Sequence, residues 1–262
     1  MKYETLRVED EGGLRVITLH RSTAANAISL KLAQELFEVA CRSAASREVR
    51  AIILTGEGRF FCAGGDVRSF RDNANIMGDF LLRITTYVHS AVSRLHRMNA
   101  PLIVAVNGVA AGGGFSLALA GDLVFAGQSA RFTMGYAGIG MSPDGTASYF
   151  LPRVVGLRRA QELMLTDRML NAEEALEWGI VTKVVEDAVL LDEARELGRR
   201  LASGPTGAYG STKRLLASSF GSGLETQAEL ESRAIAARAV SSDGQEGIEA
   251  FLEKRPPSFR GD

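Results

Sequence analysis

Two glycine-rich clusters and one acidic loop contain the residues whose types and spacing could do chemistry. The clusters are residues 63–66 (AGGD) and residues 112–114 (GGG), and the loop carries Asp144 in the string SPDG. Glycine lets a ligand approach backbone N–H groups closely and permits positive φ. A helix that begins near Gly113 would add free N–H groups and the positive end of its dipole, which suits a developing oxyanion. The spacing alone is also typical of tight turns, so both interpretations stay open at this point.

Several other chemistries lack the residues they need. The sequence contains neither GxGxxG nor GxxxxGK[ST], so binding of NAD or ATP has no motif to support it. Cys41 and Cys62 are the only cysteines, and there are three histidines. These residues provide neither a disulfide framework nor a CxxC metal site, and they suit a reducing, cytoplasmic compartment.

The composition is that of an ordinary globular protein. Of 262 residues, 46% are hydrophobic and 23% are charged, and the net charge is −1. This balance provides no global field for nucleic acid or an anionic membrane, so we expect neither as a partner. The apolar stretch 102–120 is long enough for a membrane span. Its glycine run favours a buried strand followed by a buried helix instead.

The elements that must position these residues follow from the hydrophobic pattern. Both glycine clusters come shortly after a predicted strand, and short strands that alternate with helices indicate an α/β fold. After about residue 188 only helical patterns occur. We therefore expect an α/β core over residues 1–200 and a helical region over residues 201–262. The predicted strands are 14–19, 50–54, 102–106 and 122–126, and the predicted helices are 29–44, 79–98, 115–120, 191–202, 207–218, 224–240 and 245–253.

Four segments, in order along the chain, resemble the crotonase, or enoyl-CoA hydratase/isomerase, superfamily. They are FFCAGGDVRSF (60–70), APLIVAVNGVAAGGGFSLALAGD (100–122), ARFTMGYAGIGMSPDGTASYFLPRVVG (130–156) and AFLEKRPPSF (250–259). The resemblance implies a spiral of repeated ββα units followed by a C-terminal helical trimerisation region. It also implies assembly as a homotrimer or a dimer of trimers.

The resemblance further implies the substrate and the shared chemistry. The substrate would be an acyl-CoA thioester, with coenzyme A as part of the substrate and no prosthetic group. By motif position, the N–H groups of Gly65 and Gly113 would hold the thioester oxygen. Proton removal α or γ to that carbonyl gives an enolate, and the loss of one such donor typically costs about 10² to 10³ in rate.

The side chains around these glycines favour isomerisation. A hydratase of this family has two glutamates, at positions occupied here by Ser116 and Tyr136. Neither residue type has a pKa suited to a general base at neutral pH. Asp144 lies where family isomerases carry their single base, including the ring-opening isomerase of aerobic phenylacetate breakdown. One shuttling carboxylate can move a double bond, so we predict an isomerase with Asp144 as its base.

Three alternatives remain open at this stage. Asp144 also matches the nucleophile of the 4-chlorobenzoyl-CoA dehalogenase branch, and His89 lies where that branch carries a histidine base. The large aromatic residues that clamp the benzoyl ring there are Gly65, Val88 and Tyr136 here. Hydratase-type activity is a second alternative, and an inactive binding or assembly scaffold is a third. His89 and Tyr136 are kept as candidate catalytic residues because of the positions they occupy.

The resemblance also assigns residues to coenzyme A. Small residues would let the adenine and pantetheine lie flat on the main chain, and a few cations would meet the phosphates. Phe251 and Lys254 share one face of the last predicted helix and would reach the adenine and a phosphate, often those of a neighbouring subunit. Asp66 is expected to anchor its loop. The full candidate set is Arg21, Ala25, Ala27, Ala63, Gly65, Asp66, Val67, Phe251 and Lys254.

Overall fold

The computed structural model describes residues 3–262, and its centre is a six-stranded sheet. The first two strands, at one edge of the sheet, are antiparallel, and every other neighbouring pair is parallel. The strand order is β1 (Leu6–Glu11), β2 (Leu14–Leu19), β3 (Ala51–Gly56), β5 (Leu102–Val106), β7 (Leu123–Gly127) and β10 (Lys183–Val185).

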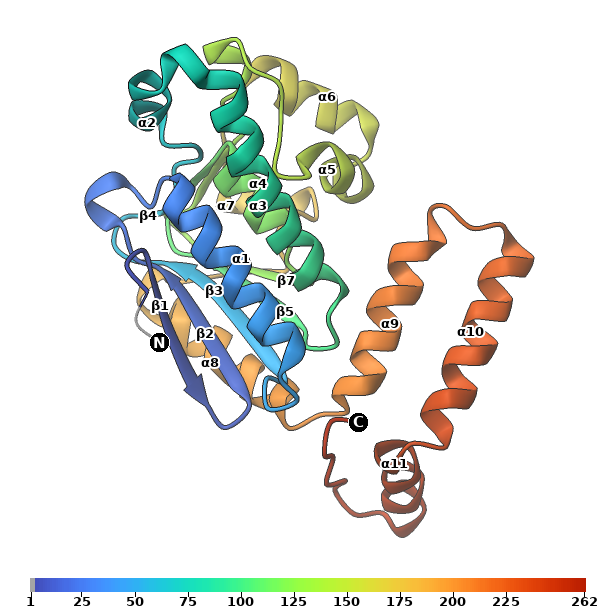
Figure 1. Cartoon of the computed structure of the whole chain (residues 1–262). Coiled ribbons are helices and arrows are strands. Elements are labelled where there is room, and N and C mark those ends of the chain that lie inside the picture. The colour runs from blue at the N-terminus through green and yellow to red at the C-terminus, as the bar shows by residue number, and fades with distance from the viewer. Residues whose placement is uncertain (1–2) are drawn as a thin grey trace.

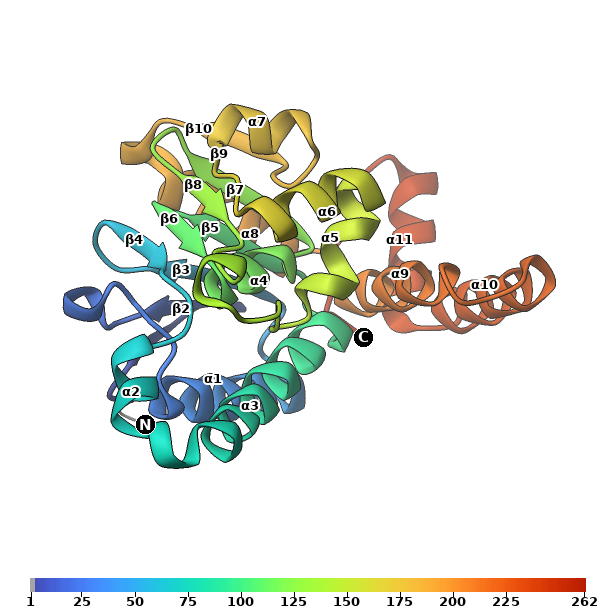
Figure 2. The same cartoon turned by 90° about the horizontal axis from the view of Figure 1, so that it is seen from above.

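Helices cover both faces of this sheet (Figures 1 and 2). The helices α1 (Leu30–Ala45) and α3 (Met77–Arg97) pack together on one face, and α8 (Leu190–Ala202) covers the other. The side chains of β3 alternate between the two layers: Ile52 belongs to the core with α1 and α3, and Ile53 to the core with α8. Strands buried on both faces have continuous apolar sequences, which explains the pattern of β3 and β5.

A second, four-stranded sheet lies beside the first and reveals the repeat of the fold. Its order is β4 (Phe60–Cys62), β6 (Val109–Ala111), β8 (Arg131–Thr133) and β9 (Leu170–Asn171). Three times in succession, the chain passes from a strand of the large sheet to a strand of the small sheet and then to a helix. These are the ββα units of a crotonase-type spiral, as the resemblance predicts.

The remaining elements are short helices around this spiral and a helical C-terminal segment. The C-terminal helices project from the body beyond α8 (Figure 1). The short helices are α2 (Val67–Asp72), α4 (Gly113–Leu119), α5 (Ala147–Val155), α6 (Leu157–Thr166) and α7 (Ala172–Glu177), with 3₁₀ turns at Ser22–Ala24, Ala74–Ile76, Ala137–Ile139 and Asp187–Val189. The C-terminal helices are α9 (Thr206–Ser219), α10 (Leu224–Ala239) and α11 (Ser242–Glu253).

Most of the longer elements confirm the predictions from sequence, but the six-residue β1, the helices α2, α5, α6 and α7 and the short strands were not predicted. The predicted strands and the long helices lie within a few residues of their observed bounds, and Ser29 caps α1 by accepting a hydrogen bond from the Leu32 N–H. The sequence analysis missed β1, β4, β6, β8, β9 and β10. Most of these have two or three residues, too few to establish a period, and pairing with neighbours defines them. No helix within residues 3–262 is long and apolar enough to cross a membrane.

A buried ion pair ties α9 to the core. Lys213 is only 8% exposed, and its Nζ lies 2.7 Å from Asp122 Oδ2. The ammonium also donates to the carbonyl oxygens of Leu95 and Ala100, at 3.1 and 3.0 Å. Burial lowers the pKa of Lys213, and the charge of Asp122 opposes that shift. The pair therefore fixes the position from which the C-terminal helices leave the body.

We expect Lys213→Met to lower the free energy of unfolding by about 3 kcal/mol, because it leaves the Asp122 carboxylate without its cation. Lys183→Met is the matched control, since Lys183 pairs with Glu193 at the exposed surface and such pairs contribute about 0 to 1 kcal/mol. Urea denaturation of both variants measures the difference. Equal losses in the two variants would contradict a special role for the buried pair.

Candidate active site

The two glycine clusters lie side by side because the strands before them are paired. β4 and β6 run parallel, and each ends where its glycine cluster begins. A Cβ placed on Gly64 would lie 2.8 Å from the Ala111 carbonyl oxygen and 3.4 Å from the Gly113 nitrogen. Gly64 also has φ +91°, a conformation that L side chains rarely adopt. The close approach of the two loops therefore requires glycine at this position.

The N–H groups of Gly65 and Gly113 are the two that the resemblance assigns to the thioester oxygen. α4 begins at Gly113, so this N–H has no partner within its helix. Within residues 3–262, neither N–H finds a hydrogen-bond acceptor. Gly112, the residue before Gly113, has φ +51° and donates its N–H to the Thr133 carbonyl oxygen at 3.0 Å. This hydrogen bond holds the turn, and the N–H of Gly113 that follows has no acceptor among the described residues.

Asp144 and Tyr136 meet directly in front of Gly113. The Tyr136 hydroxyl donates a hydrogen bond to Asp144 Oδ1. A Cβ placed on Gly113 would lie 3.8 Å from that carboxylate oxygen and 3.9 Å from the Tyr136 hydroxyl oxygen. The carboxylate, the phenol and the start of α4 therefore surround one small region.

Tyr136 keeps its proton in this setting. The side chain is buried at 9% exposure. Burial raises the pKa of Tyr136 well above its usual value, and the charge and hydrogen bond of Asp144 raise it further. The phenol therefore acts as a neutral hydrogen-bond donor to the carboxylate. It is no base at neutral pH.

Ser116 lies fully buried in α4 and binds two carbonyl oxygens. Its hydroxyl is 3.2 Å from the Gly112 oxygen and 2.9 Å from the Asp144 main-chain oxygen. The same hydroxyl is 3.5 Å from the Tyr136 oxygen. The resemblance predicts a glutamate at this position in a hydratase, whereas the serine found here contacts the backbone of the Asp144 loop.

His89 also contacts this loop, from α3. The Gly145 N–H donates to His89 Nε2 at 3.0 Å. An imidazole nitrogen that accepts from an N–H carries no proton, so the proton of neutral His89 is on Nδ1. The lone pair that a general base would use is therefore already engaged.

The segments assigned to coenzyme A form one continuous surface of main chain. The Ala63 N–H donates to the Ala25 oxygen at 3.0 Å, and the Ile28 N–H donates to the Gly64 oxygen at 2.7 Å. Ala27 lies between these contacts, and Val67 is exposed at the start of α2. The structure therefore brings the two predicted segments together.

Arg21 and Asp66 brace this surface. Arg21 Nη2 lies 3.0 Å from Asp66 Oδ2, and Arg21 Nη1 donates to the Ala27 carbonyl oxygen at 2.5 Å. Asp66 also caps α2 by accepting from the Ser69 N–H at 3.3 Å. The charge and hydrogen bond of Arg21 help to hold the pKa of Asp66 below its usual range, although burial opposes the shift.

Asn26 is a structural residue of the site that the sequence analysis missed. It is 0% exposed, and its amide nitrogen donates to the carbonyl oxygens of Glu57 and Phe60 at 2.9 and 2.8 Å. Its amide oxygen accepts from the Arg21 N–H at 2.9 Å. Asparagine tolerates the positive φ of +53° found here. A polar residue among three alanines was the signal that could have indicated it.

Phe251 and Lys254 lie apart from these residues within one chain. Both are on or just after α11, at the opposite end of the molecule from the loop between β4 and α2 (Figure 1). Phe251 is 82% exposed. The chain does not bring them to its own glycine clusters.

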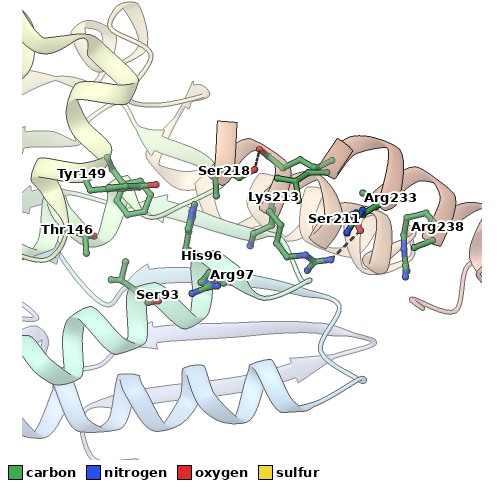
Figure 3. A pocket seen from close by; sticks show the side chains of 18 residues that line it. Ser93, His96, Arg97, Thr146, Tyr149, Ser211, Lys213, Ser218, Arg233 and Arg238 are labelled. Carbon is green, nitrogen blue, oxygen red and sulfur yellow. Dashed lines mark hydrogen bonds between the residues drawn. The ribbon is translucent and has the colours of Figure 1, made fainter. Parts of the chain in front are cut away.

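A cavity of about 790 Å³ lies between α3, α5, α9 and α10 (Figure 3). His96 and Arg97 enter it from α3, and Arg233 and Arg238 from α10. It contains neither glycine cluster nor Asp144. Despite its size, it is therefore not the site of the candidate catalytic residues, although Thr146 and Lys213 line it.

Comparison with known proteins agrees with this geometry. The spiral of ββα units with a helical C-terminal region is the crotonase fold. A crystal structure of an enoyl-CoA hydratase from Polaromonas sp. JS666 superposes with a TM-score of 0.93 at 31% identity, covering 97% of this chain and 99% of that one. The family model described as enoyl-CoA hydratase/isomerase matches residues 9–262, so the chain belongs to that family.

Relatives within the family carry different activities in their names. The chain is 38% identical over 252 residues to the 1,2-epoxyphenylacetyl-CoA isomerase of Escherichia coli (strain K12), and the match covers 96% of each chain. It is 35% identical over 251 residues to 4-chlorobenzoyl coenzyme A dehalogenase-2 of Arthrobacter sp., covering 95% of this chain and 91% of that one. Family membership therefore leaves the reaction to be argued from the side chains.

We expect Asn26→Ala to lower the free energy of unfolding by about 2 kcal/mol or more. The change leaves two buried carbonyl oxygens and one N–H without the hydrogen bonds that the Asn26 side chain makes to them. Asn75→Ala is the control, since Asn75 is exposed and such changes usually stay within about 0.5 kcal/mol. Chemical denaturation of both variants provides the comparison. An Asn26→Ala protein as stable as Asn75→Ala would show that these hydrogen bonds contribute little.

Proposed function

We propose that this protein is an enoyl-CoA isomerase, which moves a double bond in an acyl-CoA thioester with Asp144 as its only acid–base group. The observation that carries the proposal is the position of Asp144. Its carboxylate lies in front of Gly113, where α4 begins, and accepts a hydrogen bond from Tyr136. A base and an oxyanion donor thereby face the same region.

A single carboxylate is sufficient to remove and return the one proton that the reaction moves. With a 3-enoyl-CoA, Asp144 takes a proton from the α carbon, and the electron pair of that C–H bond becomes part of a conjugated enolate. The negative charge collects on the thioester oxygen. The protonated Asp144 then returns the proton at the γ carbon, which leaves a 2-enoyl-CoA and the starting carboxylate.

Gly65 and Gly113 would hold the enolate oxygen. Both have N–H groups without an acceptor within residues 3–262, as two-point binding of an oxyanion requires. The start of α4 adds the positive end of a helix dipole. Preorganised donors of this kind contribute about 3 to 4 kcal/mol each to transition-state stabilisation.

The surrounding side chains favour isomerisation over hydration and dehalogenation. Hydration in this family uses two carboxylates, whereas Ser116 and Tyr136 are neutral and engaged with the backbone and Asp144. A dehalogenase would need His89 as a base, but His89 Nε2 accepts the Gly145 N–H. A carboxylate poised at Gly113 also argues against an inactive scaffold.

We expect Asp144→Asn to reduce turnover of a 3-enoyl-CoA by about 10² to 10⁴-fold, because the variant loses its acid–base group. The variant should also lose deuterium exchange at the α carbon in heavy water. Asp192→Asn, an exposed change on α8, should retain both activities. Absorbance of the conjugated product and NMR of the exchanged thioester measure the two steps.

Four outcomes would contradict the proposal. Undiminished isomerisation by folded Asp144→Asn would remove Asp144 as the base. Net addition of water to a 2-enoyl-CoA would indicate a hydratase, and chloride release from an aryl-CoA would indicate a dehalogenase. Wild-type protein with no α-proton exchange on any acyl-CoA would indicate an inactive scaffold.

For coenzyme A, we propose the main-chain surface formed by Ala25, Ala27 and residues 63–67. Small side chains and exposed backbone there leave room for a flat ligand, and Arg21 provides a cation at its edge. Phe251 and Lys254 would contact coenzyme A held by another copy, because their own chain places them at its far end (Figure 1).

We also propose that α9, α10 and α11 form the contacts that assemble copies of this chain into a trimer or a dimer of trimers. α10 has 16 residues, none of which is buried in the single chain. Ile235 on α10 is 72% exposed, and Leu252 on α11 is 73% exposed. A helix without a buried face has little tertiary packing to stabilise it, and a large exposed apolar surface indicates an interface.

We expect wild-type protein to have at least three times the mass of one chain and Ile235→Glu to shift toward the monomer, because a charge at an apolar interface is costly. Leu165→Glu is the matched control, since Leu165 is 75% exposed on α6, outside the C-terminal helices. Light scattering after size-exclusion chromatography measures the masses. A monomeric wild type, or equal disruption by both changes, would contradict the proposal.

A further inference from the structure

The peptide bond between Asp144 and Gly145 is held at both of its polar ends. Ser116 of α4 donates its hydroxyl to the Asp144 carbonyl oxygen at 2.9 Å. His89 of α3 accepts the Gly145 N–H at 3.0 Å. This carbonyl and this N–H belong to one peptide unit, so two helices hold a single rigid plane from opposite ends.

The backbone around this peptide has a conformation that needs support. Gly145 has φ +61°, and Thr146, which is not glycine, has φ +70°. A Cβ placed on Gly145 would lie only 2.6 Å from the Ser116 Cβ. Non-glycine residues in such conformations persist only where the surroundings impose them. The contacts of Ser116 and His89 contribute to that support, together with the Ala147 N–H, which also donates to the Asp144 carbonyl oxygen at 3.1 Å.

The Asp144 side chain depends on the same peptide. Its Cα adjoins the held plane, so a rotation of that plane would move the carboxylate away from Gly113. Tyr136 restrains only the outer end of the side chain, through Oδ1. Hydrogen bonds at the backbone and at the carboxylate therefore fix different parts of one residue.

We propose that His89 and Ser116 are positioning residues for the reaction: together they hold the Asp144–Gly145 peptide and so aim the Asp144 carboxylate at the substrate beside Gly113. The inference rests on the proposed role of Asp144 as the base. It assigns His89 to an accepting role in its neutral form, with the proton on Nδ1, in place of proton transfer to substrate. Ser116 acts through its hydroxyl on the carbonyl end.

The test measures kcat and KM of His89→Leu, His89→Gln, Ser116→Ala and the double variant His89→Leu/Ser116→Ala with a 3-enoyl-CoA. Misplacing a catalytic group by about 1 Å can cost on the order of 100-fold in rate. We expect His89→Leu and Ser116→Ala to lower kcat by about 10- to 100-fold with KM within about threefold, because substrate binding is not touched.

Two further comparisons separate positioning from general damage to the fold. His89→Gln should recover kcat to within about threefold of wild type, because its amide oxygen can accept the Gly145 N–H as Nε2 does. The double variant should lose less than the product of the single losses, since both contacts act on one peptide. In an Asp144→Asn background, His89→Leu should cause no further loss.

His96 provides the matched control on the same helix. It lies on α3, seven residues beyond His89, and its Nε2 is buried without a hydrogen-bond partner among the described residues. Figure 3 shows it at the separate cavity. We therefore expect His96→Leu to keep the wild-type kcat. That result would show that loss of an imidazole from α3 is not sufficient to slow the reaction.

The outcomes distinguish this inference from the proposed function. An active Asp144→Asn would overturn both, because there would be no base to aim. If Asp144→Asn is inactive while His89→Leu and Ser116→Ala turn over like wild type, the positioning role alone is wrong. Equal loss in His89→Gln and His89→Leu, or strictly multiplicative losses in the double variant, would also overturn it.

Discussion

The parallel pairing of β4, β6 and β8 is the constraint on which the rest of the site depends. Each of these short strands is the second strand of one ββα unit, and the chain leaves each at the same edge of the small sheet. The loop after β4 carries Gly65, the link after β6 carries Gly113, and the loop after β8 carries Asp144. Gly64 thereby comes close to Gly113, and Gly113 comes close to Asp144. A strand shifted by one residue would turn each side chain to the other face and disperse the site.

Hydrogen bonds from buried side chains to the main chain then fix the loops that the strands only bring near. Asn26 holds the carbonyl oxygens of Glu57 and Phe60, and Ser116 and His89 hold the peptide after Asp144. Loops have no ladder of their own to satisfy buried polar groups, so side chains must do it. This explains why polar side chains that bind the main chain surround the site. It also explains why their loss is expected to alter geometry before it alters binding.

The division between shared and specific parts of the site follows from the same construction. Free N–H groups at glycines suit any reaction that places negative charge on a thioester oxygen. In the proposed reaction, side chains on the loop after β8 and on α4 would decide which proton moves. Here that loop offers a carboxylate and a neutral phenol, and α4 offers a serine engaged with the backbone. The names of relatives vary for the same reason: one scaffold supports several reactions.

The sequence by itself determined the α/β class, most of the long strands and helices and the glycine clusters, and it singled out Asp144 as the candidate base. Those features depend on local period, turn chemistry and residue type, which neighbours in the chain define. It could not determine β4, β6, β8 and β9, because two or three residues show no period until a partner strand pairs with them. It also could not reveal what Asn26, Ser116 and His89 contact, since His89 and Gly145 are 56 residues apart. Only the tertiary structure decided that the histidine accepts a backbone N–H, because hydrogen-bond partners distant in sequence are set by the packing of helices on sheets.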